Sequence, residues 1–544
     1  MTGREGGRGA GATLNETRLR WQRSGRPPAG APRVGLLATY TVDPLVPYLG
    51  VATHDAGLPV EPRVGPFNQV VQQCVDDAGD MAAWRPDVLV VAPRLEELPD
   101  AVDLLRCADA AVSAADRWGS LLLFVLPAVP PERPYGAGDG GRPAGRVASA
   151  GAVREALRGR LAGLAGVSVA DADEAVRAVG ERAAYRPSLF RFAGIPYAEP
   201  VFAALAAQLA ALLRLWYAGP RRLVVLDADS ILRPAGGDDG RPPPARVLEP
   251  ALAALHRAGT RLAVRSTGAP DEVWAALVAA LPAVARDCLD GWVVDDRPPR
   301  AHVAELVGGA GLTPRQAVLV YAGDADPVDA PCPLAGLGPD PDEWPAELRA
   351  AGVFDRLPPA EETPAAAAPA EETPAAATSG PVPLSLAGYV AGLDVRLSFE
   401  PLTPATAAQA SRIVAAAHDF TFGSGIDPAA PDERRVLVVS VRDRLGDYGP
   451  AAVVGYHLDT GVCVVDLFSV SCPVLGKGVE AAVLRELVER AAAAGGHTIE
   501  LRCPTTARNA VAVGFVAAAA GKTWPVGPGR EVAVVAGPAG RAEA

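Results

Sequence analysis

The sequence is poor in lysine, in aromatic residues and in paired cysteines. Only two of its 51 lysines and arginines are lysines, and aromatic residues make up 5% of the 544 positions. The seven cysteines are scattered and form no C-x-x-C pair, which argues against a disulfide framework and against a zinc site. Alanine, valine and leucine are therefore expected to supply most of the core.

Long apolar runs and positive net charge are also missing. No stretch of 18 or more apolar residues is free of charges, so no membrane span is expected. Residues 1–32 lack the apolar core of a signal peptide and are predicted to be a disordered tail. The net charge of −12 argues against nucleic-acid binding. These features together predict a cytoplasmic protein.

Continuous apolar runs alternate with helical stretches through the first half of the chain. The first part, residues 33–198, has such runs from Arg33 and at 86–93 and 120–127, with an alanine-rich helix between Leu98 and Trp118. Buried strands that alternate with helices are typical of a parallel sheet. We therefore predict an N-terminal α/β domain over these residues.

The second part, residues 199–358, repeats the same alternation. Its expected strands are 222–227, 261–266, 291–295 and 317–322, and its expected helices lie near 248–258, 270–281 and 301–311. This order predicts a doubly wound parallel sheet.

A spacer and a third α/β part complete the chain. Residues 359–385 contain the unit A-E-E-T-P-A-A-A twice and lack large apolar residues, which predicts a flexible linker. Residues 386–535 combine a helix, several strands and a glycine turn that opens a second helix, an order that suggests an acetyltransferase-like domain. Residues 536–544 are a short tail.

Four polar residues follow successive strands of the second part. Asp227 and Asp229 end the first strand, Ser266 ends the next and Asp324 follows the last. Since ligands bind at the carboxyl ends of strands, Asp227 could attack a phosphorus atom, Asp229 could act as general acid or base, and Ser266 could hold a phosphate oxygen. Asp227, Asp229 and Asp324 could bind Mg²⁺. The alternative is that these residues only cap their strands.

Seven motifs resemble, in order, those of the FkbH-like proteins of polyketide and related pathways. The motifs are T-Y-T-V-D-P-L with G-P-F-N-Q (65–69), G-I-P-Y (194–197), L-D-A-D-S-I-L-R-P-A-G-G-D-D-G (226–240), V-F-D-R-L (353–357), V-R-D-R-L-G-D-Y-G (441–449), S-C-P-V-L-G-K-G-V-E (471–480) and P-T-T-A-R-N-A (504–510). The resemblance covers nearly all of residues 33–535.

This resemblance implies three domains: an N-terminal SGNH-like hydrolase-like domain, a central haloacid-dehalogenase (HAD) phosphatase core and a C-terminal GNAT-like acyltransferase domain. It also implies an activity. Such proteins dephosphorylate 1,3-bisphosphoglycerate, a phosphorylated three-carbon donor, with Mg²⁺. They pass the glyceryl group through an enzyme thioester to the phosphopantetheine thiol of an acyl carrier protein.

The resemblance suggests an acyl site in the C-terminal domain. Cys472 is the thiol best placed for the thioester, and the following helix N-terminus could lower its pKa. Gly476, Lys477 and Gly478 open that helix and could bind the pantetheine phosphate. Asn509 could hydrogen-bond the pantetheine amides. The alternative for Cys472 is a buried core residue.

Several positions depart from the family's pattern. Ile231 stands where the family has threonine, Arg265 where it has cysteine, and Pro299 where it has a lysine that stabilises an aspartyl-phosphate, with Arg300 the nearest cation. The leading hypothesis remains glyceryl transfer to a carrier protein. The alternatives are a catalytically degenerate protein that docks a carrier protein, and a CoA-dependent acyltransferase with a structural HAD domain.

Overall fold

The computed structural model describes residues 13–98, 100–232, 243–323, 329–357, 385–423, 435–506, 509–527 and 530–537. It divides the chain into two compact units. The first comprises Met1–Gly50, Val60–Leu205 and Thr363–Ala544, and the second comprises Val51–Pro59 and Ala206–Glu362. Asp324, the linker 359–384 and the tail from 538 onward lie outside the described residues.

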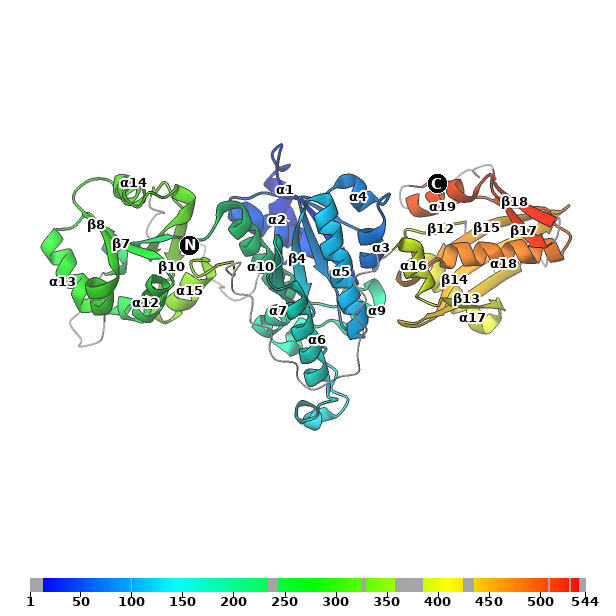
Figure 1. Cartoon of the computed structure of the whole chain (residues 1–544), viewed down its shortest axis with the longest axis horizontal. Helices are drawn as coiled ribbons and strands as arrows, with labels where there is room; N and C mark the ends of the chain where they lie inside the picture. The colour runs from blue at the N-terminus through cyan, green and yellow to red at the C-terminus, as the bar shows by residue number, and fades with distance from the viewer. Residues whose placement is uncertain are drawn as a thin grey trace, which may run out of the picture. The chain divides into compact units, whose positions relative to one another are not determined.

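The N-terminal part of the first unit is a five-stranded parallel sheet. Its strands are β1 (Arg33–Ala38), β2 (Glu61–Val64), β3 (Val88–Ala92), β4 (Leu121–Leu126) and β5 (Val167–Asp171), in the order β2-β1-β3-β4-β5. Helices α2 (Leu45–Asp55), α3 (Val70–Val75), α4 (Asp80–Trp84), α5 (Ala101–Trp118), α6 (Arg146–Leu161) and α7 (Ala172–Val179) connect them (Figure 1). The predicted parallel sheet is confirmed.

The second unit is also built on a five-stranded parallel sheet. Its strands are β6 (Leu223–Asp227), β7 (Arg261–Ser266), β8 (Leu289–Val294), β9 (Ala317–Ala322) and β10 (Leu334–Leu337), in the order β10-β9-β6-β7-β8. Helices α12 (Glu249–Arg257), α13 (Pro270–Ala280), α14 (Pro299–Gly309) and α15 (Trp344–Ala350) surround this sheet in Figure 1. The doubly wound sheet predicted from the apolar runs is therefore present.

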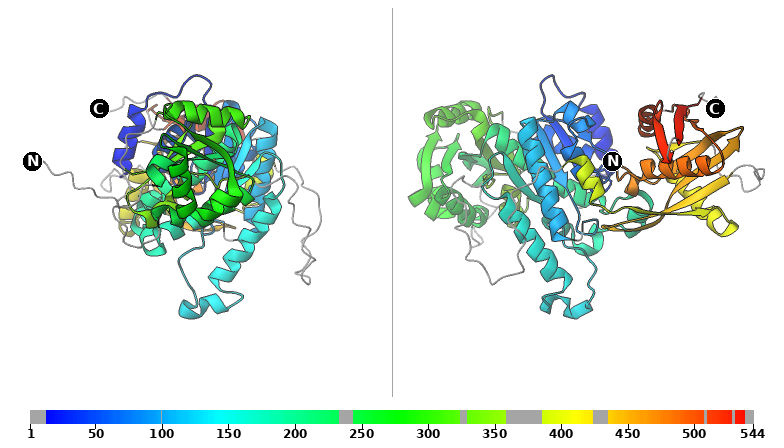
Figure 2. Two further views of the ribbon diagram at one scale, coloured as in Figure 1. Left: turned by 90° about the vertical axis from the view of Figure 1, so that its left-hand side faces the viewer. Right: turned by 45° about the vertical axis from the view of Figure 1, so that its right-hand side comes forward.

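The C-terminal part of the first unit holds a mixed sheet. Antiparallel strands β11 (Arg396–Pro401), β13 (Arg435–Asp443), β14 (Gly446–Asp459) and β15 (Val462–Val470) are followed by β16 (Thr498–Leu501), which is parallel to β15. Strands β18 (Arg530–Ala536), β17 (Thr523–Gly527) and β12 (Thr421–Phe422) complete it, and the helices are α17 (Pro404–Ala416), α18 (Val479–Ala493) and α19 (Ala510–Ala519). In Figure 2, α18 is the orange helix that lies across this sheet.

The apolar face of α18 explains why this helix packs on the mixed sheet. Val483, Leu487 and Ala491 are spaced four residues apart and are buried with Phe468 of β15. This spacing places them on one side of the helix. The loop that precedes α18 is thereby held at the end of β15, which fixes the segment in which Cys472 and the two glycines lie.

Part of the predicted N-terminal tail is ordered. Leu14–Arg23 form helix α1, so the disorder expected for all of residues 1–32 is wrong for this segment. Thr13 and Glu16 form a capping box at its start, and the backbone N–H of Leu14 donates to Glu199 at 2.8 Å. Two local hydrogen-bond partners and one distant carboxylate therefore stabilise a segment that was predicted to be disordered.

One described helix, α10 (Glu199–Ala218), has the length and composition of a membrane span. Half of its apolar window is buried within the protein, and its Arg214 is buried and pairs with Asp355 at 2.7 Å. A single such helix is weak evidence for a span, since core helices of soluble proteins share these properties.

Candidate functional site in the second unit

Asp227 and Asp229 lie at the carboxyl end of β6. The strand is apolar and buried until Asp227, which ends it and precedes the short helix α11 (Ala228–Ile231). Because β6 lies between β9 and β7, it stands where the winding of the sheet reverses. Ligands of open α/β sheets bind at this point, so the fold places the two aspartates where a site is expected.

Arg265 of β7 occupies the space between the two carboxylates. Its side chain is buried, with 3% of the residue exposed, and one guanidinium nitrogen forms an ion pair with Oδ1 of Asp227. The Nη1 atom lies 2.9 Å from Oδ2 of Asp229 and donates a hydrogen bond to it. One permanent cation therefore pairs with both predicted catalytic acids.

The end of β7 supplies the other partners of Asp229. The Ser266 hydroxyl donates to Oδ1, the Thr267 backbone N–H lies 3.0 Å from Oδ2, and the Thr267 hydroxyl lies 2.9 Å from the same oxygen. Ser266 and Asp229, both predicted as site residues, are thus in direct contact. Ser266 serves here as a donor to a carboxylate of the protein itself.

Asp227 is held from the other side by Ser230. The Ser230 hydroxyl lies 2.7 Å from Oδ2 of Asp227, and it accepts a hydrogen bond from the backbone N–H of Ala322 at 3.0 Å. Ser230 therefore links the end of β6 to the end of β9. Ser230 was not among the predicted site residues.

The pKa shifts of the two aspartates oppose the roles that the sequence suggested. Burial raises the pKa of Asp227, and Arg265 and Ser230 only partly offset this effect. Burial also acts to raise the pKa of Asp229, but hydrogen bonds from Ser266 and Thr267 outweigh it, so the pKa lies below its usual value. A nucleophile should be the more readily ionised acid and a general acid the less readily ionised one, which is the reverse of this order.

The described residues of this site do not fit Mg²⁺. All four carboxylate oxygens of Asp227 and Asp229 already have a partner: Oδ1 of Asp227 pairs with Arg265, and the other three accept hydrogen bonds. Mg²⁺ requires about six oxygen ligands in octahedral geometry, and a guanidinium between the carboxylates leaves no anionic ligand free. Among the described residues, no group of three His, Cys, Asp or Glu side chains could hold a metal ion.

The other departures from the family's pattern have structural roles. Ile231 is 1% exposed and packs in the core of the second unit. Pro299 is the first residue of α14, and Arg300 pairs with Asp329 at 2.9 Å on the surface. Arg300 is therefore engaged elsewhere, and Arg265 is the cation that contacts the aspartates.

The glycine turn of the C-terminal domain begins α18 as predicted. Gly476 and Gly478 have φ angles of +70° and +82°, a conformation that favours glycine. The N–H of Gly476 donates to Oε1 of Glu480 at 3.3 Å. A carboxylate of the chain itself thus uses one of the amides that were predicted to bind a phosphate.

Lys477 points into the protein. It is 2% exposed, its Nζ lies 2.7 Å from Oδ2 of Asp443, and it also donates to the Tyr448 hydroxyl. Asp443 accepts backbone hydrogen bonds within the β13–β14 hairpin as well. This ion pair ties the glycine turn to the hairpin, and the ammonium group is not available to a phosphate.

Cys472 is half-buried at the end of β15, beside the core of the domain. Burial raises the pKa of its thiol, and backbone amides of His418 and Asp419 offset only part of this effect. The lowering expected from the helix N-terminus is therefore not found. Cys503 is half-buried in the same core, and sequence reasoning did not single it out.

Asn509 is a structural residue in this geometry. It is 1% exposed, its Oδ1 accepts the Thr506 N–H at 2.8 Å, and its Nδ2 donates to the carbonyl of Pro504 at 2.9 Å and to that of Thr421 at 3.2 Å. These bonds use the hydrogen-bonding groups that a pantetheine amide would need.

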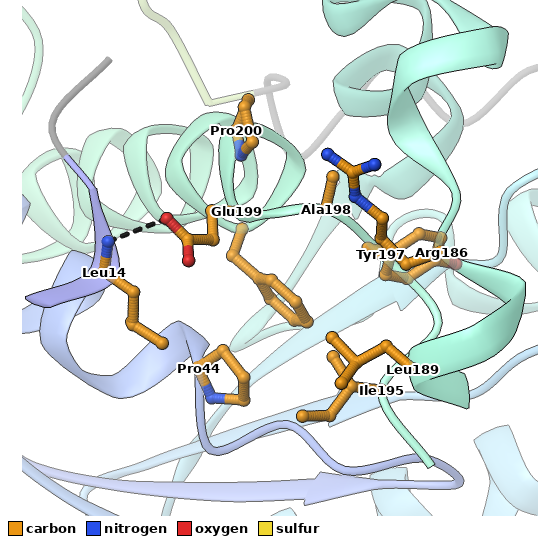
Figure 3. A pocket seen from close by; sticks show the side chains of 10 residues that line it. Leu14, Pro44, Arg186, Leu189, Ile195, Tyr197, Ala198, Glu199 and Pro200 are labelled. Atoms are coloured by element: carbon orange, nitrogen blue, oxygen red, sulfur yellow. Dashed lines mark hydrogen bonds between the residues drawn. The ribbon is translucent and has the colours of Figure 1, made fainter. Parts of the chain in front are cut away.

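A cavity of about 360 Å³ lies in the N-terminal part of the first unit and contains none of the predicted site residues. Figure 3 shows that its walls are mostly apolar, with Arg186 on one side and Glu199, bonded to the backbone of Leu14, on the other. The lining residues are Leu14, Pro44, Arg186, Leu189, Ile195, Tyr197, Ala198, Glu199, Pro200 and Phe202.

Comparison with known proteins shows the fold. No family model and no curated protein matches the sequence. The chain is similar to the N-terminal part of BF1531 from Bacteroides fragilis, which contains a phosphatase domain and was solved with Mg, at 13% identity and a TM-score of 0.53 over 63% of this chain and 99% of that one. The ribosomal-protein-S18-alanine N-acetyltransferase of Escherichia coli matches 25% of this chain and 88% of its own length at 16% identity, with a TM-score of 0.19, too low for inference. The chain therefore shares the α/β fold of a phosphatase-containing protein.

Proposed function

We propose that this chain is an FkbH-like protein of secondary metabolism that docks an acyl carrier protein without dephosphorylating a donor. The ion pair of Asp227 with the buried Arg265 is the main support for a protein that does not dephosphorylate a donor. A carboxylate can attack phosphorus only when it is ionised and exposed to its substrate. Asp227 is 3% exposed and its carboxylate is already paired with Arg265, so it is not exposed to a substrate.

The motifs of the C-terminal domain support the carrier-protein role. S-C-P-V-L-G-K-G-V-E lies between β15 and α18, and V-R-D-R-L-G-D-Y-G supplies Asp443 and Tyr448, which hold Lys477 in place. Two segments that resemble the FkbH-like family thus act together to fix one turn. A turn fixed in this way can serve as a docking site even though Lys477 itself is buried.

Glyceryl transfer from 1,3-bisphosphoglycerate is the second candidate. It is favoured by the contact between Asp229 and Ser266, which places acids and a hydroxyl at neighbouring strand ends as a phosphatase requires. Cys472 would then carry the glyceryl group as a thioester. Glyceryl transfer predicts a covalent adduct on Cys472, whereas docking alone predicts none, so one experiment separates the two functions.

The test combines binding with mass measurement on the full chain. Surface plasmon resonance compares the holo and apo forms of a polyketide acyl carrier protein, and intact-protein mass spectrometry follows incubation with labelled 1,3-bisphosphoglycerate and Mg²⁺. We expect both forms of the carrier protein to bind and no glyceryl adduct to form. A variant with Cys472→Ser should behave like the wild type, and Cys503→Ser is the matched control.

Three results would contradict this proposal. A glyceryl adduct that Cys472→Ser removes and Cys503→Ser retains would establish transfer instead. Binding of neither form would show that the chain does not dock a carrier protein. Acetylation of the holo carrier by acetyl-CoA would favour a CoA-dependent acyltransferase with a structural HAD domain.

A further inference from the structure

An arginine inside an otherwise apolar strand needs acidic partners. Strand β7 reads R-L-A-V-R-S, and every residue after Arg261 is buried. Charged side chains are almost never fully buried unless they are paired. Arg265 satisfies this requirement with two carboxylates from the adjacent β6–α11 segment, Asp227 and Asp229.

We propose that the guanidinium of Arg265 is a built-in replacement for a divalent cation, and that the site at the end of β6 is independent of metal. Two carboxylates that meet in a poorly solvated site repel each other unless a cation lies between them. In metal-dependent sites of this kind a bound ion has that role. Here a side chain with a permanent charge has it instead.

The hydrogen-bond donors around the aspartates agree with this replacement. Ser230 and Ser266 donate to the two carboxylate oxygens that the guanidinium does not contact. Thr267 donates twice to Asp229. A guanidinium has five N–H donors in a fixed plane, so it can reach two carboxylates at once. The result is a cluster in which one cation pairs with both acids, and the chain alone positions them.

The replacement also predicts what removal of the arginine would do. Without the side chain of Arg265, Asp227 and Asp229 remain at the same strand end, held by Ser230, Ser266 and Thr267. Two carboxylates that lack a counterion are the ligands that Mg²⁺ and Mn²⁺ prefer. Arg265→Ala should therefore create affinity for a divalent cation.

This inference shares the Arg265 pair with the proposed function but does not depend on carrier-protein binding, so the two can fail separately. The experiment titrates the full chain with Mn²⁺, followed by electron paramagnetic resonance, and competes the bound ion with Mg²⁺. The substitution Asp229→Asn is added to each protein, and Mn²⁺ binding that it abolishes is assigned to this site. Arg261→Ala is the matched control, because Arg261 lies on the same strand but is exposed and bonds to the carbonyl of Ala310.

We expect neither the wild type nor Arg261→Ala to bind Mn²⁺ at the two aspartates. Adding Asp229→Asn to either protein should therefore leave its Mn²⁺ binding unchanged. Arg265→Ala should gain one such site, with affinity higher by about tenfold or more, and its melting temperature should rise with Mg²⁺. A wild-type site that is lost in Asp229→Asn would overturn the proposal, as would a folded Arg265→Ala variant that binds no Mn²⁺. If Arg265→Ala does not fold, the wild-type titration decides the question alone.

Discussion

The Nη1 atom of Arg265 lies 2.9 Å from Oδ2 of Asp229, and a second nitrogen of the same guanidinium pairs with Asp227. This relationship joins two strands of the second unit through one charged cluster. The acids that a phosphatase would use for chemistry are here part of the packing between β6 and β7. Their substitution should therefore change stability before it changes any activity.

The first prediction compares the two aspartates. Asp227→Ala should destabilise the second unit by about 3–5 kcal/mol, because it leaves Arg265 buried with one partner fewer. Asp229→Ala should cost only about 1–3 kcal/mol, since the side chain of Asp229 is 29% exposed and water can replace its contacts. Hydrogen exchange measured by mass spectrometry on peptides from β6 and β7 reports the difference. Equal protection in the two variants would contradict it.

The double variant Asp227→Ala/Arg265→Ala provides the control for this comparison. Removal of both leaves only Asp229, which is partly exposed and keeps its hydrogen bonds from Ser266 and Thr267, so the loss of stability should be smaller than the sum of the two single losses. Strict additivity would mean that the pair does not interact.

Most of the second unit's sheet could be predicted from sequence because its strands are continuous apolar runs. The limits of β7 and β9 agree with the predicted 261–266 and 317–322. Strands β2 and β10 were missed, because both have only four residues and alternate between exposed and less exposed positions. A short strand of this kind is specified by its neighbours in the sheet and carries little signal of its own.

The contact between Asp229 and Ser266 was foreseeable, because adjacent parallel strands end at the same edge of a sheet. The role of Arg265 was not recognised, although an arginine within a buried strand was a signal that acids must lie near it. The side chains of Lys477 and Asn509 point into the protein because of loop geometry and of partners distant in sequence. Neither spacing nor periodicity contains that information.

The second prediction concerns the buried pair of Lys477 and Asp443. Lys477→Met should destabilise the C-terminal domain by about 3–5 kcal/mol, because the side chain of Asp443 is fully buried and would lose its counterion. Hydrogen exchange of the β13–β14 hairpin should rise. The other lysine of the chain, Lys522, is exposed, so Lys522→Met should change stability by less than about 0.5 kcal/mol. A similar effect of both substitutions would refute the structural role of Lys477.

The third prediction is a pH dependence in the N-terminal domain. Burial raises the pKa of Glu97 to about 7, beside Arg94 and Glu96. The folded state therefore binds this proton more tightly than the unfolded chain does, so the contribution of Glu97 to stability is greatest at low pH. It declines as the pH rises from about 4.5, the pKa of an unfolded glutamate, to about 7.

Glu97→Gln should remove this decline. Relative to wild type, the variant should gain about 2 kcal/mol between pH 5 and pH 8. Urea titrations followed by hydrogen exchange of β3 peptides at three pH values measure the gain. Glu155→Gln is the control, since the side chain of Glu155 is 76% exposed on α6 of the same domain. A constant difference between Glu97→Gln and wild type would show that Glu97 does not titrate in this range.

The fourth prediction tests whether Asn509 supports the fold or contacts a ligand. Asn509→Ala removes an acceptor for Thr506 and two donors, to Pro504 and Thr421, in a buried position. It should cost about 1–3 kcal/mol and increase proteolytic cleavage near Pro504 even when no carrier protein is present. Asn509→Asp keeps the acceptor but places a buried carboxylate against the carbonyls of Pro504 and Thr421, so its effect should be at least as large as that of Asn509→Ala. If both variants are as stable as wild type and only bind the holo carrier protein less tightly, Asn509 acts on the ligand, because a purely structural residue must change the free protein first.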